Sequence, residues 1–125
     1  MEWPTTFEEA LEIQQRLRTQ VATHDDFGEV GTVAGVDAGY EPSPEAPEEY
    51  GVARAAVVVL AFPALEPLDY AVARAPTSFP YVPGFLSFRE TPAVLEALGQ
   101  LRVRPDLLIC DGQGIAHPRR FGIAC

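Results

Sequence analysis

The order of the apolar segments limits the folds open to this chain more than any other feature. Three strand-like segments, at residues 32–36, 52–62 and 68–73, precede a short helix at 93–100 and a last apolar run at 105–110. Strands that meander pair antiparallel, and a helical crossover returns the chain to a parallel strand. The sequence therefore predicts an α/β fold with a mixed sheet of three antiparallel strands, a helix and one buried parallel strand. Asp37 and Asp111 are expected at equivalent strand ends.

Both helices carry start signals. Thr6 and Glu9 have the spacing of a capping box, in which a hydroxyl and a carboxylate satisfy backbone amides of the first turn. A one-sided apolar stripe then predicts a helix that reaches about Thr23 and packs on the sheet. Thr91 and Pro92 supply a cap and a first-turn proline, so we expect the second helix to begin directly after them.

The composition is that of one ordinary folded domain. Hydrophobic residues make up 47% of the 125 residues and charged residues 22%, which argues against a disordered chain. No apolar run approaches the ~18 residues that cross a bilayer, and the N-terminus does not read as a signal peptide. We therefore expect a single domain over residues 1–125, a cytoplasmic location and no membrane association. Cys110 and Cys125 show neither metal-ligand spacing nor a disulfide framework.

Charge is distributed unevenly along the chain. The formal net charge of −9 argues against a protein whose whole surface is suited to phosphates. No arginine or lysine lies between Arg18 and Arg54, whereas arginines recur from residue 89 onward. The second part of the chain is therefore the part that can face a polyanion. All nine basic residues are arginine, which suits bidentate phosphate contacts or simply reflects genome composition.

Three carboxylates are the candidates for metal chemistry. Neighbouring strands lie about 4.8 Å apart, so acidic residues at adjacent strand ends can share a pair of cations about 4 Å apart. Such hard oxygen ligands suit Mg²⁺. We predict that Asp37, Glu90 and Asp111 are catalytic ligands of Mg²⁺, for which Mn²⁺ can substitute. The alternative for each aspartate is that it only terminates its strand.

Two prolines make a stiff loop ahead of the second helix. Pro80 and Pro83 bracket Tyr81 and Val82, fix φ on both sides and remove two amide donors, so this segment cannot join a sheet. Together with Asp111-Gly-Gln-Gly-Ile-Ala-His-Pro-Arg-Arg120 and Val33-Ala-Gly-Val-Asp-Ala-Gly-Tyr40, the run from Phe79 to Glu90 resembles motifs of the endonuclease V family. The order of the elements predicts the ribonuclease H-like arrangement, and the resemblance implies the same fold.

The resemblance also implies an activity and a role for each motif. Endonuclease V proteins are Mg²⁺-dependent endodeoxyribonucleases of DNA repair that recognise deoxyinosine, the product of adenine deamination, and cleave the second phosphodiester bond on its 3′ side. The implied partners are therefore inosine-containing DNA, with inosine-containing RNA left open, and no obligate protein partner. The implied sites are a DNA wedge of Pro80, Tyr81, Val82 and Pro83, a base pocket of Gly84, Leu86 and Gly112, and phosphate contacts from His117, Arg119 and Arg120.

Several readings stay open at this point. The family continues for about as many residues again, including a lysine and a histidine near the site. Without them we expect little cleavage and self-association through the unpaired edge of the last strand. The alternatives are a fragment that only binds metal or damaged nucleic acid, and another ribonuclease H-like nuclease. Arg89 either pairs with a carboxylate or holds the strand, and Tyr81 either wedges DNA or covers the core. Phe85 and Phe88 are expected in the core, with a role as stacking platforms as the alternative.

Overall fold

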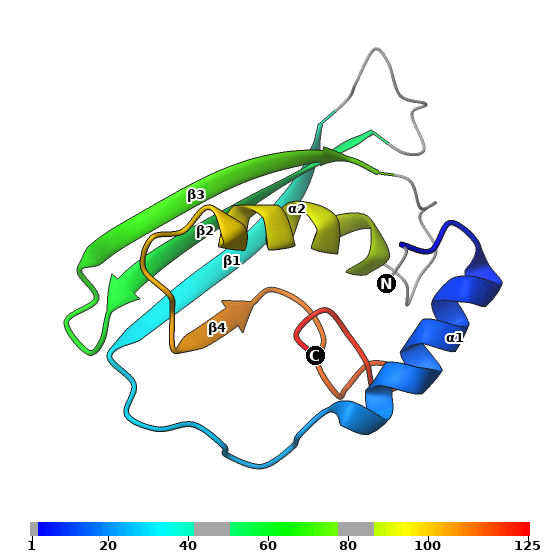
Figure 1. Ribbon diagram of the computed structural model, residues 1–125, viewed down its shortest axis with the longest axis horizontal. Helices are drawn as coiled ribbons and strands as arrows, with labels where there is room; N and C mark the ends of the chain where they lie inside the picture. The colour runs from blue at the N-terminus through cyan, green and yellow to red at the C-terminus, as the bar shows by residue number, and fades with distance from the viewer. Residues whose placement is uncertain (1–2, 42–50, 78–86) are drawn as a thin grey trace.

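One mixed sheet, with a helix lying across one of its faces, dominates the protein (Figure 1). The structure is a computed structural model and describes residues 3–41, 51–77 and 87–125. The sheet has the order β3-β2-β1-β4. Its strands are β1 (Thr32–Glu41), β2 (Val52–Ala61), β3 (Pro67–Pro76) and β4 (Leu107–Cys110).

The pairing of the strands confirms the predicted fold class. β1 pairs antiparallel with β2, and β2 pairs antiparallel with β3. Helix α2 (Ser87–Gly99) then leads to β4, which lies parallel to β1 at the edge of the sheet. No helix in the described ranges is both long enough and apolar enough to cross a membrane.

The core lies between α2 and one face of the sheet. Along β2 the side chains alternate, so that Val57 and Val59 are fully buried while Val58 between them is 41% exposed. Small residues of the helix and the neighbouring strands complete this layer: Ala34, Ala53, Ala55, Ala71, Ala73, Ala93 and Ala97. Because alanine adds little bulk, the helix can lie close to the sheet, and burial of apolar surface stabilises the pair.

The opposite face of the sheet is apolar and exposed. It carries Val58 on β2, Tyr70 and Val72 on β3, and Ile109 on β4. Ile109 is 66% exposed and Leu108 is 46% exposed, so the prediction of a buried last strand is wrong for this chain. A continuous apolar run predicts a buried strand only where both faces of the sheet are covered. β4 lies at the edge of the sheet, and its Leu108 and Ile109 are exposed.

The first helix is shorter than predicted and packs elsewhere. α1 (Phe7–Leu17) is followed by one turn of 3₁₀ helix (Arg18–Gln20), not by further α-helix to residue 23. The Thr19 hydroxyl donates to the Arg16 carbonyl at 3.0 Å, a local bond that competes with helix continuation. The predicted cap is confirmed, because the Glu9 amide donates to Thr6 Oγ1 at 3.2 Å.

α1 contributes to a second, smaller apolar cluster instead of packing on the sheet. Ala10 of α1 and Phe88 of α2 are buried together, and Trp3, Leu11 and Ile13 pack around them. The predicted core position of Phe88 is therefore confirmed, while Phe85 lies outside the described residues. The side chain of Phe7 is 47% exposed, because the buried face of α1 is centred on Ala10 and Gln14.

The second helix starts earlier than its proline indicated. α2 already includes Ser87 and continues through Pro92, so the prediction of a start after Pro92 is wrong. A proline at position 92 cannot donate to the carbonyl of Phe88, four residues earlier. The indole Nε1 of Trp3 donates to that carbonyl at 2.8 Å instead. A tertiary hydrogen bond thus replaces the missing helical one and lets the helix run through the proline.

At the end of the sheet remote from Asp37, the carboxylates of Asp69 and Asp106 connect segments that are distant in the sequence. Asp106 accepts hydrogen bonds from the amides of Gly31 and Thr32, at 2.8 and 3.1 Å, and these bonds hold the pKa of its carboxyl below the usual value. Asp69 accepts from the amides of Arg102 and Val103, with the same effect on its pKa. Part of the acidic character of the chain is therefore used to position the segments that enter β1 and β4.

Candidate active site

Asp37 and Asp111 lie beside each other because β1 and β4 are parallel neighbours. The last register pair of the two strands is Val36 with Cys110, so the next residue of each chain is an aspartate. The prediction that Asp37 lies at a strand end is wrong, because β1 continues to Glu41, which is opposite Val52 of β2. Only β4 ends here, and Asp111 follows it directly. Asp37 therefore lies on a strand braced by β2, at the point where β1 loses its other neighbour.

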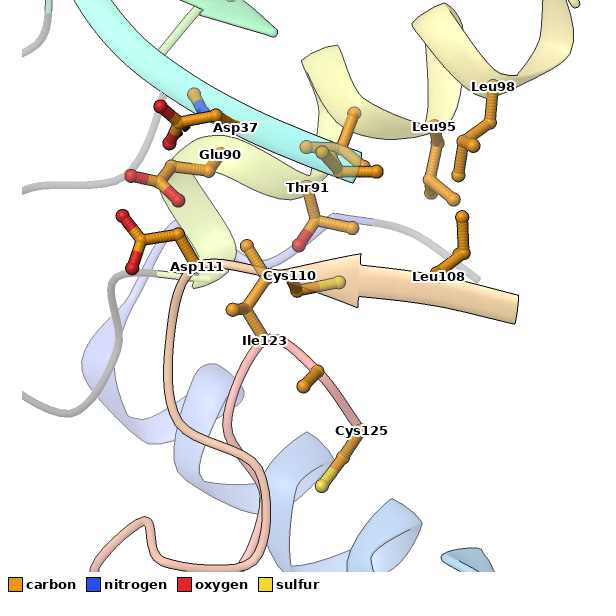
Figure 2. Close-up of a pocket in the computed structure, with 14 residues that line it drawn as sticks. Asp37, Glu90, Thr91, Leu95, Leu98, Leu108, Cys110, Asp111, Ile123 and Cys125 are labelled. Carbon is orange, nitrogen blue, oxygen red and sulfur yellow. Dashed lines mark hydrogen bonds between the residues drawn. The ribbon is translucent and has the colours of Figure 1, made fainter. Parts of the chain in front are cut away.

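Glu90 brings a third carboxylate from α2. Figure 2 shows Asp37, Glu90 and Asp111 directed to the same side, from a strand, a helix and the end of a strand. Glu90 is only 9% exposed, whereas Asp37 and Asp111 are exposed. Three segments that are far apart in the sequence thus present acidic side chains at one place.

The environment of Glu90 opposes its ionisation. Burial raises the pKa of its carboxyl above the usual value, and the negative charges of Asp37 and Asp111 raise it further. A hydrogen bond from the Tyr40 hydroxyl to Oε1 of Glu90, 3.1 Å long, and the charge of Arg89 act in the opposite direction. Asp37 and Asp111 thus repel a negative charge on Glu90, and a bound cation would relieve this repulsion.

Tyr40 contacts both Glu90 and the neighbouring Arg89. The guanidinium carbon of Arg89 lies 4.6 Å from the centroid of the Tyr40 ring, within the range of a cation–π contact. Arg89 is buried and belongs to α2, so it braces the helix against β1. The contribution of Tyr40 was missed in the sequence. The available signal was its position within the motif, three residues after Asp37. Because side chains alternate along a strand, Tyr40 points to the face opposite that of Asp37.

The donor set fits a hard divalent cation by type. Carboxylate oxygens are the ligands that Mg²⁺ and Mn²⁺ prefer, and mutual repulsion among them favours a cation. Among residues 3–41, 51–77 and 87–125, however, no three acidic, histidine or cysteine side chains are grouped closely enough to hold an ion as they stand. The three carboxylates therefore point to the same side and interact electrostatically. Their grouping around an ion is a proposal.

A pocket of ≈ 290 Å³ opens next to the carboxylates, between α2 and β4. Its wall is mainly apolar, with Leu95 and Leu98 from α2, Leu108 from β4, and Ile123 from the segment after β4 (Figure 2). Burial raises the pKa of the Cys110 thiol, which keeps this side chain neutral in the pocket. The sequence reasoning did not identify this pocket, because its walls come from elements whose packing only the fold determines.

Most of the predicted wedge and base pocket lies outside the described residues. This applies to Pro80, Tyr81, Val82, Pro83, Gly84 and Leu86. Gly112 is described and directly follows Asp111. A Cβ atom at Gly112 would lie 2.6 Å from Cγ2 of Ile123, so close packing with the last residues of the chain requires glycine there.

The predicted phosphate contacts have different environments. His117 is buried, and its Nδ1 accepts a hydrogen bond of 3.0 Å from the amide of Arg119. Arg119 donates from Nε to Oε1 of Gln14, a fully buried side chain of α1. Arg120 is exposed, with its amide bound to the His117 carbonyl at 2.8 Å. Arg119 thus anchors this loop to α1, His117 forms hydrogen bonds within the loop, and Arg120 is the exposed residue of the three.

The fold and the site together define a ribonuclease H-like α/β protein. The family model of endonuclease V matches residues 15–125, and the chain belongs to the endonuclease V family. It is 63% identical to "Endonuclease V" of Roseiflexus castenholzii over 98% of this chain and 52% of that protein. The crystal structure of endonuclease V from Streptomyces avermitilis superposes with a TM-score of 0.85 at 46% identity, covering 97% of this chain and 51% of that one.

A nucleic-acid complex is also among the similar structures. Endonuclease V of Ciona intestinalis, solved as a variant with a 23mer DNA containing an inosine followed by a ribo-adenosine, has a TM-score of 0.78 and 29% identity. The match covers 94% of this chain and 52% of that chain. The chain therefore spans about half the length of the relatives it matches.

Proposed function

We propose that this chain provides the carboxylate site of a Mg²⁺-dependent endodeoxyribonuclease that acts on deoxyinosine in DNA repair and cleaves the second phosphodiester bond on its 3′ side. The observation that carries the proposal is the common direction of Asp37, Glu90 and Asp111 in a chain of the endonuclease V family. The inosine-containing DNA bound by the Ciona intestinalis relative supports the choice of substrate.

The three carboxylates would hold the cation. Mg²⁺, or Mn²⁺ in its place, supplies a nucleophilic water and neutralises negative charge on a phosphate. Asp37 is held by a strand paired on β2, and its Oδ1 accepts from the amide of Ala38 at 2.9 Å. Glu90 is held by the Tyr40 hydroxyl at 3.1 Å. These contacts position two of the three ligands before any substrate arrives, which is the kind of pre-arrangement that phosphoryl chemistry requires.

The remaining residues divide between the base and the backbone of the nucleic acid. We assign Pro80, Tyr81, Val82 and Pro83 to the wedge that fills the space of an extruded base, and Gly84, Leu86 and Gly112 to the pocket that receives it. Arg120 contacts a phosphate, and His117 and Arg119 hold the loop that presents it. Inosine pairs poorly, which lowers the cost of extrusion and gives a first basis for selectivity.

A second candidate is binding of damaged nucleic acid without cleavage. One observation favours it: in the described part of the chain no three acidic, histidine or cysteine side chains are grouped closely enough to hold a metal ion. In this case the carboxylates and the loops still recognise inosine-containing strands, but the metal is held too loosely for hydrolysis.

The two candidates are separated by one experiment with two readouts. The 125-residue chain is incubated with a labelled duplex carrying a single inosine, or adenine at the same position, with Mg²⁺ or with a chelator. Mg²⁺-dependent nicking at the second phosphodiester bond 3′ of inosine supports the nuclease. Inosine-selective binding without nicking supports the second candidate. Equal binding of the two duplexes without nicking contradicts both. Asp37→Asn should abolish nicking and leave binding largely intact.

A further inference from the structure

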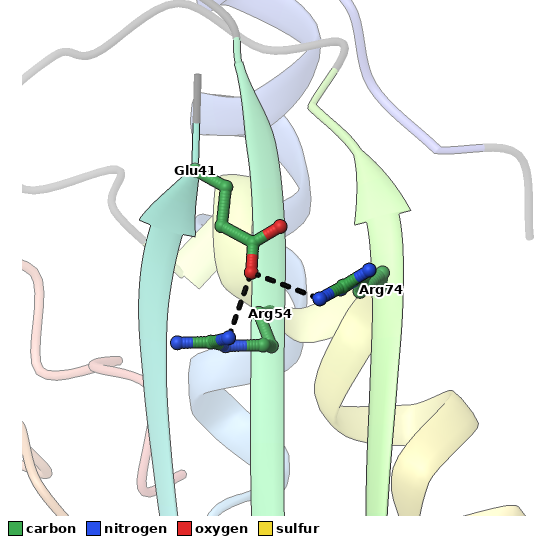
Figure 3. A network of polar contacts seen from close by, with 3 residues as sticks. All are labelled: Glu41, Arg54 and Arg74. Carbon is green, nitrogen blue, oxygen red and sulfur yellow. Dashed lines mark ion pairs between the residues drawn. The ribbon is translucent and has the colours of Figure 1, made fainter. Parts of the chain in front are cut away.

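A compact charge cluster lies at the end of the sheet near Asp37, on the face away from α2. Glu41 of β1 forms ion pairs with Arg54 of β2, at 2.8 Å, and with Arg74 of β3, at 3.3 Å (Figure 3). Both guanidinium groups meet the same carboxylate oxygen, Oε1. The side chains of Arg54 and Arg74 are 52% and 63% exposed, so both are accessible from solvent.

The register of the sheet places this cluster beside the candidate active site. Asp37 is opposite Ala56, and Gly39 is opposite Arg54, which in turn is opposite Arg74. Asp37 and Arg54 are therefore diagonal neighbours on one face of the sheet, a relationship that separates Cα atoms by about 7–8 Å. A long arginine side chain and a carboxylate can face the same bound group across that distance.

Gly39 leaves the surface between them open. Among the described residues, a Cβ atom at this position would meet no atom within 4 Å. This face therefore has no side chain in β1 between Asp37 and Glu41. Within the described part of the chain, the arginines border a strip that Gly39 leaves open and that leads to Asp37. An extended polyanion can lie along such a strip without displacing a side chain.

Stability alone gives little reason for the cluster. Exposed ion pairs contribute about 0–1 kcal/mol, and two arginines on one carboxylate leave a net positive charge. In a chain with a formal charge of −9, two exposed arginines next to a carboxylate site are a local exception. Guanidinium groups bind phosphate oxygens through pairs of parallel hydrogen bonds, and a carboxylate partner holds them in place for it.

We propose that Arg54 and Arg74 form a phosphate-binding pair that holds the backbone of a nucleic-acid strand next to the Asp37 site, with Glu41 as the residue that positions both guanidinium groups. The inference rests on the proposed nucleic-acid function and adds the surface along which the strand leaves or enters the site. The contacts are to the backbone, so they set affinity and register and do not select inosine.

The test is the salt dependence of binding. The affinity of the 125-residue chain for an inosine-containing duplex, and for the matched adenine duplex, is measured by fluorescence anisotropy at several salt concentrations. Each phosphate contact contributes about 0.9 to the slope of log affinity against log salt. The variant Arg54→Gln/Arg74→Gln should lower the slope by about 1.8 and weaken binding roughly tenfold or more. The ratio of affinities for the two duplexes should not change.

Matched variants separate a local contact from general charge. Arg104→Gln removes an exposed arginine at the other end of the sheet and should leave the slope within error of the unchanged chain. Glu41→Gln should change affinity and slope more than Glu66→Gln, which removes the same charge from the turn between β2 and β3. Thermal melting of each variant shows that the fold is retained.

The possible outcomes assign failure to one proposal or the other. If the unchanged chain prefers the inosine duplex and the double arginine variant keeps its affinity and slope, the phosphate-binding pair is wrong and the proposed function stands. If Arg104→Gln lowers the slope by about 0.9, the amount expected for one phosphate contact, the effect is one of total charge and the proposal of a phosphate-binding pair is again wrong. If the unchanged chain binds neither duplex, both proposals fail.

Discussion

Trp3 donates its indole N–H to the carbonyl oxygen of Phe88, the acceptor that Pro92 leaves without a helical donor. The two rings also pack, with centroids 5.6 Å apart. This bond ties the start of the chain to the first turns of α2, within two residues of Glu90. The helix can therefore include a proline and still present the buried carboxylate of the site.

A double-mutant cycle tests this relationship. Trp3→Phe keeps an aromatic ring but removes the donor, and should cost about 1 kcal/mol in the free energy of unfolding, as expected for a lost hydrogen bond. In the background Pro92→Ala, where residue 92 can donate to Phe88 itself, the same change should cost clearly less. Urea unfolding of the four proteins gives the coupling. Equal costs in both backgrounds would show that the indole bond does not replace the helical one.

The hydroxyl of Tyr40 should matter for metal binding. Tyr40→Phe removes the hydrogen bond to Glu90 and keeps the ring under Arg89. Because this bond lowers the pKa of Glu90, its loss should raise that pKa further and move the onset of Mg²⁺ binding to higher pH. Calorimetric titration with Mg²⁺ at several pH values measures the effect. Tyr70→Phe, on the exposed face of β3, is the control, and an identical pH profile for all three proteins contradicts the prediction.

Glu90 should cost stability in the absence of metal. Its pKa is raised in the folded protein, so the folded state favours the protonated carboxyl and ionisation opposes folding above the unfolded pKa. Glu90→Gln should therefore raise the midpoint of thermal unfolding at pH 7, with a gain that shrinks as the pH falls toward the ordinary pKa of a glutamate. Glu96→Gln, at an exposed position of the same helix, is the control. A destabilised Glu90→Gln protein at pH 7 would mean that the Tyr40 and Arg89 contacts outweigh burial.

The two faces of β2 should respond differently to the same deletion. Val57→Ala removes methyl groups at a fully buried position and should cost about 2 kcal/mol. Val58→Ala, on the exposed face, should cost less than about 0.5 kcal/mol. Chemical denaturation over a range of protein concentrations measures both. A large, concentration-dependent cost for Val58→Ala would show that another copy of the chain covers this face.

The order and type of the elements were predictable because they depend on local patterns. The strand-like run at residues 52–62 and the Thr6–Glu9 spacing are set by neighbouring residues, and both predictions are confirmed by β2 (Val52–Ala61) and by the cap of α1. Boundaries that depend on distant partners were not predictable. The start of α2 depends on Trp3, which lies 85 residues from Phe88, and the end of β1 depends on its pairing with β2 out to Val52.

The site divides in the same way. The sequence by itself singled out the side chains that we propose as cation ligands, because carboxylates suit Mg²⁺ and the motifs resemble those of the family, and it placed Asp111 directly after a strand. Only the tertiary structure decided their surroundings: the burial of Glu90, its bond to Tyr40, and the position of Arg54 diagonal to Asp37. Burial, field and register are properties of segments that meet in space, and no local pattern in the chain encodes them.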